Sequence, residues 1–292
     1  MRKYSIIAIC LFMVLQLVAC STQTIKVDGF SAPESVTSDG TYFYVSNVGE
    51  KLKPMDKDGD GYISRLSAEG DVLERKYISG LNAPKGMTVL NGILYVNDID
   101  HLKGYSVADG KQVVDQDFSA EGTSFLNGIT VIDDDKLLIS AMDTGDLFVV
   151  DASSNPTVIK LECDTDLFGP NGLSYDSKTG TIYLCSFGKD HKTNGIVGKG
   201  RIDGNRFYFE KISPRNGLYD GMVYHEGNII FSDWVDFKKE GVLIRQDAET
   251  GELSTLDLGE KIGGPADFYL DQKGKRLWIP MMLENKVMIV GY

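Results

Sequence analysis

The chain has 292 residues, 42% of them hydrophobic, and a formal net charge of −12. This acidic balance argues against a nucleic-acid-binding protein and against direct adhesion to anionic lipid, because both of those partners are negatively charged. It suits a cation, or a neutral or cationic ligand. Length alone allows two domains, but we expect one, because a single repeat pattern runs from Pro33 to the end.

The first twenty residues have the features of an export signal. Met1–Lys3 is basic, Ile6–Val18 is apolar but too short to span a bilayer comfortably, and small residues precede Cys20. The segment resembles a bacterial lipoprotein signal, which implies cleavage before Cys20 and lipid attachment to it. An ordinary secretory signal with an incidental cysteine is the alternative.

We therefore expect residues 1–20 to be removed and residues 21–292 to form the mature protein. That protein would be held at the bacterial cell envelope by its lipid anchor alone, at the outer membrane or in the periplasm if the organism is Gram-negative. We expect a monomer.

A short phrase occurs six times, at intervals of roughly 40–50 residues. Each phrase is followed by a turn containing Gly, Asp or Asn and then by a β-rich run, which is typical of a hairpin. A strand-built repeat of this length indicates a β-propeller with one blade per repeat. The phrases are Pro33–Val36, Pro84–Met87, Leu126–Ile129, Pro170–Leu173, Tyr219–Met222 and Pro265–Phe268.

The sequence thus predicts an all-β protein, a six-bladed β-propeller with four strands per blade. The last repeat ends after its third strand, Lys286–Tyr292, so the N-terminal run Thr24–Asp28 is expected to supply the fourth. Joining the two ends of the chain in one blade closes the ring and removes an exposed sheet edge. A β-sandwich with coincidental turns is the alternative, and six matched phrases disfavour it.

The second residue of each phrase should lie at an equivalent place near the central axis. Four of these six residues carry side-chain oxygens, as two carboxylates and two amides: Glu34, Asn127, Asn171 and Asp220. Such hard oxygen ligands suit a divalent cation such as calcium, and the lack of His and Cys in the phrases argues against zinc. Alternatively, these residues only cap strands and hold tight turns.

The order of the four residues resembles that of the six-bladed calcium-dependent hydrolases, namely gluconolactonase/regucalcin, paraoxonase and diisopropylfluorophosphatase. In those families a Glu, two Asn and an Asp from blades one, three, four and five hold calcium in the central tunnel. The resemblance implies a calcium-dependent hydrolase of lactones or related esters, with Asp220 as base or nucleophile. Phe125 stands where gluconolactonases carry a sugar-contacting Arg, which weakens the case for a sugar lactone.

Further side chains are expected around a substrate pocket, most of them near the ends of second strands. Phe187 and Trp234 would form its walls, and Lys85 would either neutralise the axial acids or bind an anionic substrate group. A loop histidine is more often simply solvated, which is the competing interpretation of His101. The full predicted pocket set is Lys85, Asp98, His101, Asp143, Phe187, Asp233 and Trp234.

A second calcium signal lies in the first repeat. Asp56, Asp58 and Asp60 fit positions 1, 3 and 5 of an EF-hand-type loop, and Gly61 fits position 6. Position 12 is Ser67 instead of the expected Glu, and no helices flank the loop. A solvated turn is therefore the favoured interpretation, and a structural ion is the alternative.

Two functions follow from these patterns. The first is a calcium-dependent hydrolase of lactones or related esters, acting on a small molecule. The second is a non-enzymatic propeller that binds a ligand or protein partner and holds any metal structurally, because the fold alone does not fix function.

Overall fold

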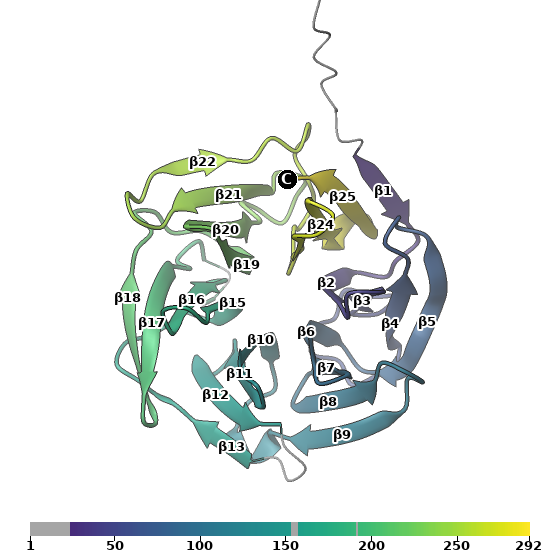
Figure 1. The fold of residues 1–292 in the computed structure, drawn as a ribbon, viewed down its shortest axis with the longest axis horizontal. Helices are drawn as coiled ribbons and strands as arrows, with labels where there is room; N and C mark the ends of the chain where they lie inside the picture. Colours follow the sequence, from purple (N-terminus) through teal and green to yellow (C-terminus); the bar gives the residue numbers. More distant parts are fainter. Residues whose placement is uncertain (1–23, 153–156, 191) are drawn as a thin grey trace, which may run out of the picture.

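The computed structural model describes residues 24–152, 157–190 and 192–292, and it confirms the six-bladed β-propeller. Figure 1 looks along the propeller axis, around which the six sheets stand in chain order. The expected signal segment and Cys20 lie outside the described residues. Within the described ranges, no helix is long and apolar enough to cross a membrane.

Each blade is an antiparallel sheet whose strands follow one another outward from the axis. The first three blades are β2 (Pro33–Ser38), β3 (Phe43–Asn47), β4 (Gly61–Leu66) and β5 (Val72–Leu81); β6 (Pro84–Leu90), β7 (Ile93–Asp98), β8 (His101–Ser106) and β9 (Gln112–Asp117); and β10 (Leu126–Asp133), β11 (Lys136–Ala141), β12 (Asp146–Asp151) and β13 (Thr157–Lys160). The short 3₁₀ turn η1 (Ser119–Glu121) follows β9.

The last three blades complete the ring. They are β15 (Pro170–Asp176), β16 (Thr181–Ser186), β17 (Val197–Asp203) and β18 (Arg206–Lys211), with β14 (Glu162–Cys163) added in parallel to β18; β19 (Tyr219–His225), β20 (Asn228–Asp233), β21 (Val242–Asp247) and β22 (Leu253–Thr255); and β23 (Tyr269–Asp271), β24 (Arg276–Met281), β25 (Lys286–Gly291) and β1 (Ile25–Asp28). A second 3₁₀ turn, η2 (Met282–Glu284), joins β24 to β25.

The ring closes as the sequence predicts. β1 pairs antiparallel with β25, with Ile25 opposite Ile289 at one end and Asp28 opposite Lys286 at the other. Lys286 Nζ also lies 2.9 Å from Asp28 Oδ1. The first and last segments of the described chain therefore share one sheet, and blade six has no open outer edge on that side.

Five of the six phrases begin an innermost strand, and each of those strands is irregular directly after its first residue. The register against the second strand shifts between Pro33 and Val36, and at the same place in β6, β10, β15 and β19. A bulge leaves its residues out of the regular ladder and re-aims their side chains. The second residue of each phrase can therefore face the axis instead of a neighbouring strand. The sixth phrase differs, because β23 begins only at Tyr269.

The third residue of four phrases is glycine because the next blade comes too close for a side chain. A Cβ at Gly128 would lie 2.0 Å from the backbone oxygen of Asn171, and one at Gly172 would lie 2.4 Å from that of Asp220. Gly86 and Gly221 meet the following blade in the same way. The innermost strands thus touch one another through their backbones around the axis.

At the bulges, backbone groups that are left out of the sheet ladder form hydrogen bonds with side chains near the ends of the second strands. Ser140 Oγ accepts a hydrogen bond from Gly128 N and donates one to Asn171 O, each at 2.8 Å. Cys185 Sγ donates to Asp220 O at 3.1 Å in the next blade. Asn97 and Ser232 donate at equivalent positions, to Asn127 O and Ala266 O. Buried backbone groups need such partners, so these bonds fix each blade against its neighbour.

The hydrophobic core lies between the blades. Most of its clusters combine residues of adjacent sheets, as where Tyr95 and Leu102 of blade two pack with Leu126 and Phe148 of blade three. Blades six and one meet where Trp278 stacks on Phe43, with ring centroids 3.9 Å apart. Blade faces are thus buried, and the axial end of each blade carries polar groups.

We predict that Gly128→Ala destabilises the protein by about 3 kcal/mol, the upper part of the range for overpacked sites. The added methyl would overlap the backbone of the next blade, which cannot move without shifting Asn171. The matched control is Gly227→Ala, where nothing lies within 4 Å and only a left-handed backbone (φ +78) opposes the change. The control substitution should lower the free energy of unfolding by about 1 kcal/mol. Chemical denaturation measures both variants, and equal losses would contradict the close-approach argument.

Candidate metal and ligand site

The four oxygen-bearing residues predicted near the axis lie together at one cavity. Glu34 on β2, Asn127 on β10, Asn171 on β15 and Asp220 on β19 all line it. The cavity has a volume of about 250 Å³. All four side chains are buried, with 2–4% of their surface exposed.

One oxygen of each of these four side chains has no hydrogen-bond partner. The unpartnered atoms are Glu34 Oε2, Asn127 Oδ1, Asn171 Oδ1 and Asp220 Oδ1. A buried oxygen without a partner costs about 1–3 kcal/mol, more if it is charged. Four such atoms on one cavity indicate a shared ligand. Two carboxylates and two amide oxygens fit a hard divalent cation, with calcium as the first candidate.

Neighbouring groups hold the side chains so that these oxygens stay free. Trp234 Nε1 donates to Asp220 Oδ2 at 3.0 Å, which occupies that oxygen and leaves Oδ1 open. Asn127 turns its amide nitrogen toward Met142 Sδ, 3.7 Å away, and so presents Oδ1 to the cavity. The orientation is set by the protein itself.

A third carboxylate, that of the half-buried Asp267, adds to the negative charge near the axis. Burial raises its pKa to about 7, and burial together with the charge of Asp267 raises the pKa of Asp220 to about 8. Burial first, and then Asp220 and Asp267, raise the pKa of Glu34 well above its usual value. Without a cation, this part of the protein resists carrying all three charges at neutral pH.

Sequence reasoning missed Asp267, although a signal was present. Asp267 is the third residue of the sixth phrase, where four other phrases have glycine. The first phrase has Ser35 at that place, and Ser35 Oγ donates to Asp267 Oδ2 at 2.6 Å. The two repeats without the glycine are thus adjacent, and their side chains bond to each other where the ring closes.

Lys85 places a buried ammonium group on the same cavity. It is 1% exposed, and its Nζ donates to the backbone oxygens of Pro54 and Ala83 at 2.7 and 2.8 Å. The ammonium also lies 4.6 Å from the ring centroid of Phe125. Burial lowers the pKa of Lys85 to about 8. Among the described residues no carboxylate forms an ion pair with it, so its charge is available to a ligand.

A ring of apolar side chains surrounds the cavity. Phe187 and Trp234, expected from the sequence to form walls, both line it and meet edge to face with ring centroids 5.3 Å apart. Each follows the last residue of its blade's second strand. The same position in the other four blades is occupied by apolar residues too, of which all but Ile99 line the cavity: Val48, Ile99, Met142 and Met282.

Three predicted pocket acids do not line the cavity, and their carboxylates accept hydrogen bonds from backbone N–H groups. Asp98 accepts hydrogen bonds from the N–H groups of Asn82 and Ala83, just before β6. Asp143 does the same for Ser124 before β10, and Asp233 binds the loop before β19. These carboxylates position the segments that lead into the innermost strands. Asp143 lines an adjoining hollow together with Phe125, Met142 and Phe187, which also line the cavity.

His101 and the acidic loop of blade one also lie outside the cavity. Asp56 is paired with Lys53, and Asp60 Oδ2 accepts the backbone N–H of Glu50 at 3.0 Å. Asp56, Asp58 and Asp60 do not converge on a shared point, since the described residues hold only one close group of three metal-binding side chains, and that group is elsewhere. This arrangement agrees with the solvated turn, the favoured interpretation of the loop.

Comparison with known proteins supports the fold. No family model matches the sequence, and no curated protein resembles it closely enough to count as a relative. A gluconolactonase from Xanthomonas campestris superposes with a TM-score of 0.64 at 14% identity, covering 92% of this chain and 89% of that one. Virginiamycin B lyase from Staphylococcus aureus gives 0.61 at 12% identity, covering 93% and 100%.

A further similar structure is an auxiliary nutrient binding protein from Bacteroides thetaiotaomicron. Its TM-score is 0.65 at 9% identity, with 93% of this chain and 77% of that chain covered. At such identities these likenesses show a shared propeller fold and no more. The same architecture thus serves proteins named for hydrolysis, for lyase chemistry and for binding, and the site residues must carry the functional argument.

We predict that the metal-free protein loses stability as pH rises from about 5 to 9. The folded-state pKa values of Asp220 and Asp267 are raised to about 8 and about 7. Their stabilising contribution is therefore complete below the unfolded pKa and is lost as pH rises through the folded values. Calorimetric melting in the presence of a chelator measures this trend. An Asp220→Asn variant should flatten it, and a wild type that melts equally well at both pH values would contradict it.

Proposed function

We propose that this protein holds a divalent cation, calcium first, between Glu34, Asn127, Asn171 and Asp220, and hydrolyses a lactone or related ester in the adjoining cavity. The observation that supports this proposal is the set of four buried, unpartnered oxygens on one cavity. They come from the innermost strands of blades one, three, four and five.

The chain's own residues have separable roles in such a reaction. A bound cation would supply Lewis-acid polarisation of a carbonyl or phosphoryl oxygen. Asp220 is the candidate base or nucleophile, and the Trp234 indole N–H fixes its orientation at 3.0 Å. The aromatic walls exclude water and contact the apolar part of the substrate.

Lys85 narrows the class of substrate in this proposal. Lys85 is the one basic side chain among the described residues that line the cavity, so its positive charge is the one that a substrate meets there. A substrate with an anionic group beside its ester or lactone bond would balance that charge. The aromatic ring of Phe125, which contacts the ammonium, stands where gluconolactonases carry a sugar-contacting Arg, so a sugar lactone is not the first candidate.

Ligand binding without turnover is the second candidate function, and the apolar character of the cavity favours it. Most of the lining is aromatic or aliphatic, as in pockets that hold a small molecule by shape. A nutrient-binding protein is among the similar structures. In this case the cation would hold the innermost strands together.

We also propose that lipid on Cys20 anchors the protein at the cell envelope. The lipobox-like sequence before Cys20 supports this. β1 begins at Ile25, five residues after Cys20, so the anchor would hold the propeller within about 18 Å of the bilayer surface even if fully extended. Blade six would then be the blade nearest the membrane.

We predict that the protein binds one calcium ion and that Glu34→Gln/Asp220→Asn weakens binding by at least about 100-fold, because affinity depends on ligand charge. Isothermal titration calorimetry measures the change. The matched control, Asp56→Asn/Asp58→Asn, removes two loop carboxylates and should bind calcium like the wild type. Unchanged binding in the axial variant, with loss in the loop variant, would contradict the axial site.

We predict that calcium-loaded protein hydrolyses at least one member of a panel of lactones and esters, with anionic members preferred. Asp220→Asn should lower turnover by at least about 1,000-fold, while circular dichroism shows a retained β-fold. Asp98→Asn, which alters a carboxylate outside the cavity, is the control and should keep the activity of any folded protein. Calcium binding with no turnover across the panel would favour ligand binding over catalysis.

A further inference from the structure

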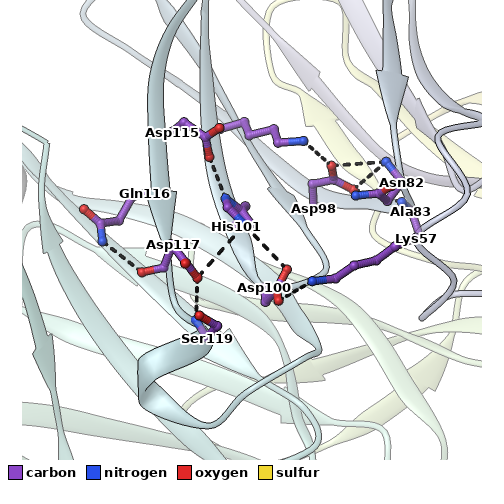
Figure 2. A network of polar contacts seen from close by, with 11 residues as sticks. Lys57, Asn82, Ala83, Asp98, Asp100, His101, Asp115, Gln116, Asp117 and Ser119 are labelled. Atoms are coloured by element: carbon purple, nitrogen blue, oxygen red, sulfur yellow. Dashed lines mark hydrogen bonds and ion pairs between the residues drawn. The ribbon is translucent and has the colours of Figure 1, made fainter.

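A separate group of side chains that could hold a metal ion lies in blade two, where the β7–β8 turn meets the end of β9 (Figure 2). Asp100 lies in that turn, His101 begins β8, and Asp117 ends β9 directly opposite His101 in the sheet register. Their donor atoms all lie within 4.8 Å of one another. It is the only such group among the described residues, and it shares no residue with the axial cavity.

The imidazole of His101 is oriented by a carboxylate. Its Nδ1 lies 2.6 Å from Asp115 Oδ1, so Nδ1 carries the proton and donates to that oxygen. The other ring nitrogen, Nε2, faces Asp100 and Asp117, as Figure 2 shows. Carboxylate–histidine pairs of this type commonly orient a histidine that binds a metal.

The separations within the cluster suit an ion and do not suit hydrogen bonds. Nε2 lies 3.9 Å from Asp100 Oδ1 and 4.0 Å from Asp117 Oδ1, beyond hydrogen-bond range. Two donors that share one tetrahedral metal with bonds of about 2.0–2.2 Å lie about 3.3–3.6 Å apart. The two carboxylates therefore need to close on the imidazole by about 0.5 Å to share one ion with it.

A second, independent observation is that Asp100 is buried and has one carboxylate oxygen without a partner. Its residue surface is 6% exposed, and its Oδ1 has no hydrogen-bond partner. The other oxygen, Oδ2, is already bound by Lys57 Nζ at 2.5 Å. A buried carboxylate oxygen without a partner is unfavourable, and a cation held between it and Nε2 would supply one.

We propose that Asp100, His101 and Asp117 form a second metal site, for a divalent transition ion with zinc first. One imidazole nitrogen and two carboxylate oxygens suit zinc and its neighbours, whereas the all-oxygen axial site suits calcium. Asp117 is held by the backbone N–H of Ser119, 2.7 Å from its Oδ1. The ion joins the β7–β8 turn to the end of β9, and Lys57 extends this connection to blade one.

The site is tested with zinc and cobalt alone on the full chain, after saturation with calcium. Wild type should bind one Zn²⁺ by calorimetry, and Co²⁺ should give the visible absorption of an ion bound to nitrogen. His101→Gln should weaken binding at least about 100-fold, and Asp115→Asn about 10–100-fold. His225→Gln changes a histidine of another blade and should bind like the wild type.

Two further variants make the result decisive. Asp117→Asn alters an exposed side chain, and it should weaken zinc binding even if His101→Gln fails to fold. Glu34→Gln/Asp220→Asn should keep zinc binding, which would separate this site from the axial one. The proposal is overturned if zinc binding survives in Asp117→Asn and His101→Gln, if it is lost in the axial variant, or if wild type binds no zinc.

Discussion

Each innermost strand that begins with a phrase has a bulge, where backbone N–H and C=O groups leave the regular hydrogen-bond ladder. Side chains of the same or the neighbouring blade form hydrogen bonds with these groups. Ser140 shows the device most fully, since one hydroxyl accepts from Gly128 N and donates to Asn171 O. The missing side chain at Gly128 lets the two backbones approach closely enough for this bond. The same contact sets the position of Asn171. The packing of one blade on the next therefore also fixes where this proposed metal ligand lies. A propeller held in this way presents its axial side chains from a rigid support.

The axial cavity contains buried charges and unpartnered polar atoms, which a stable protein interior normally avoids. It is lined by two buried carboxylates and one buried ammonium, and it leaves four oxygens without partners. Such local conflicts are expected at functional sites, where a ligand completes what the protein leaves open. The blade interfaces, with stacked pairs such as Phe43 and Trp278, provide the stability that permits this. In the proposed function, the cation relieves the carboxylates and the substrate meets Lys85.

The fold and the axial residues could be predicted because repetition makes positions equivalent. Once the phrases are aligned, Glu34, Asn127, Asn171 and Asp220 fall at one place without further information. The roles of residues that have no equivalent in the other repeats could not be predicted in this way. Asp267 belongs to the phrase that forms no strand, and Asp98 turns to backbone groups that only the folded loop presents. The partnership of His101 with Asp117 depends on strand register, because sixteen positions separate them in the sequence.

The pairing of β1 with β25 also governs when the protein can finish folding. Five blades consist of consecutive strands and can form as the chain emerges, because their contacts are local. Blade six cannot, since its outer strand is near the start of the chain and its partner is near the end. The axial residues of blades one and five reach their final spacing only when that sheet closes. A chain that crosses a membrane N-terminus first would remain an open arc, without its ligand site, until its last strand had followed.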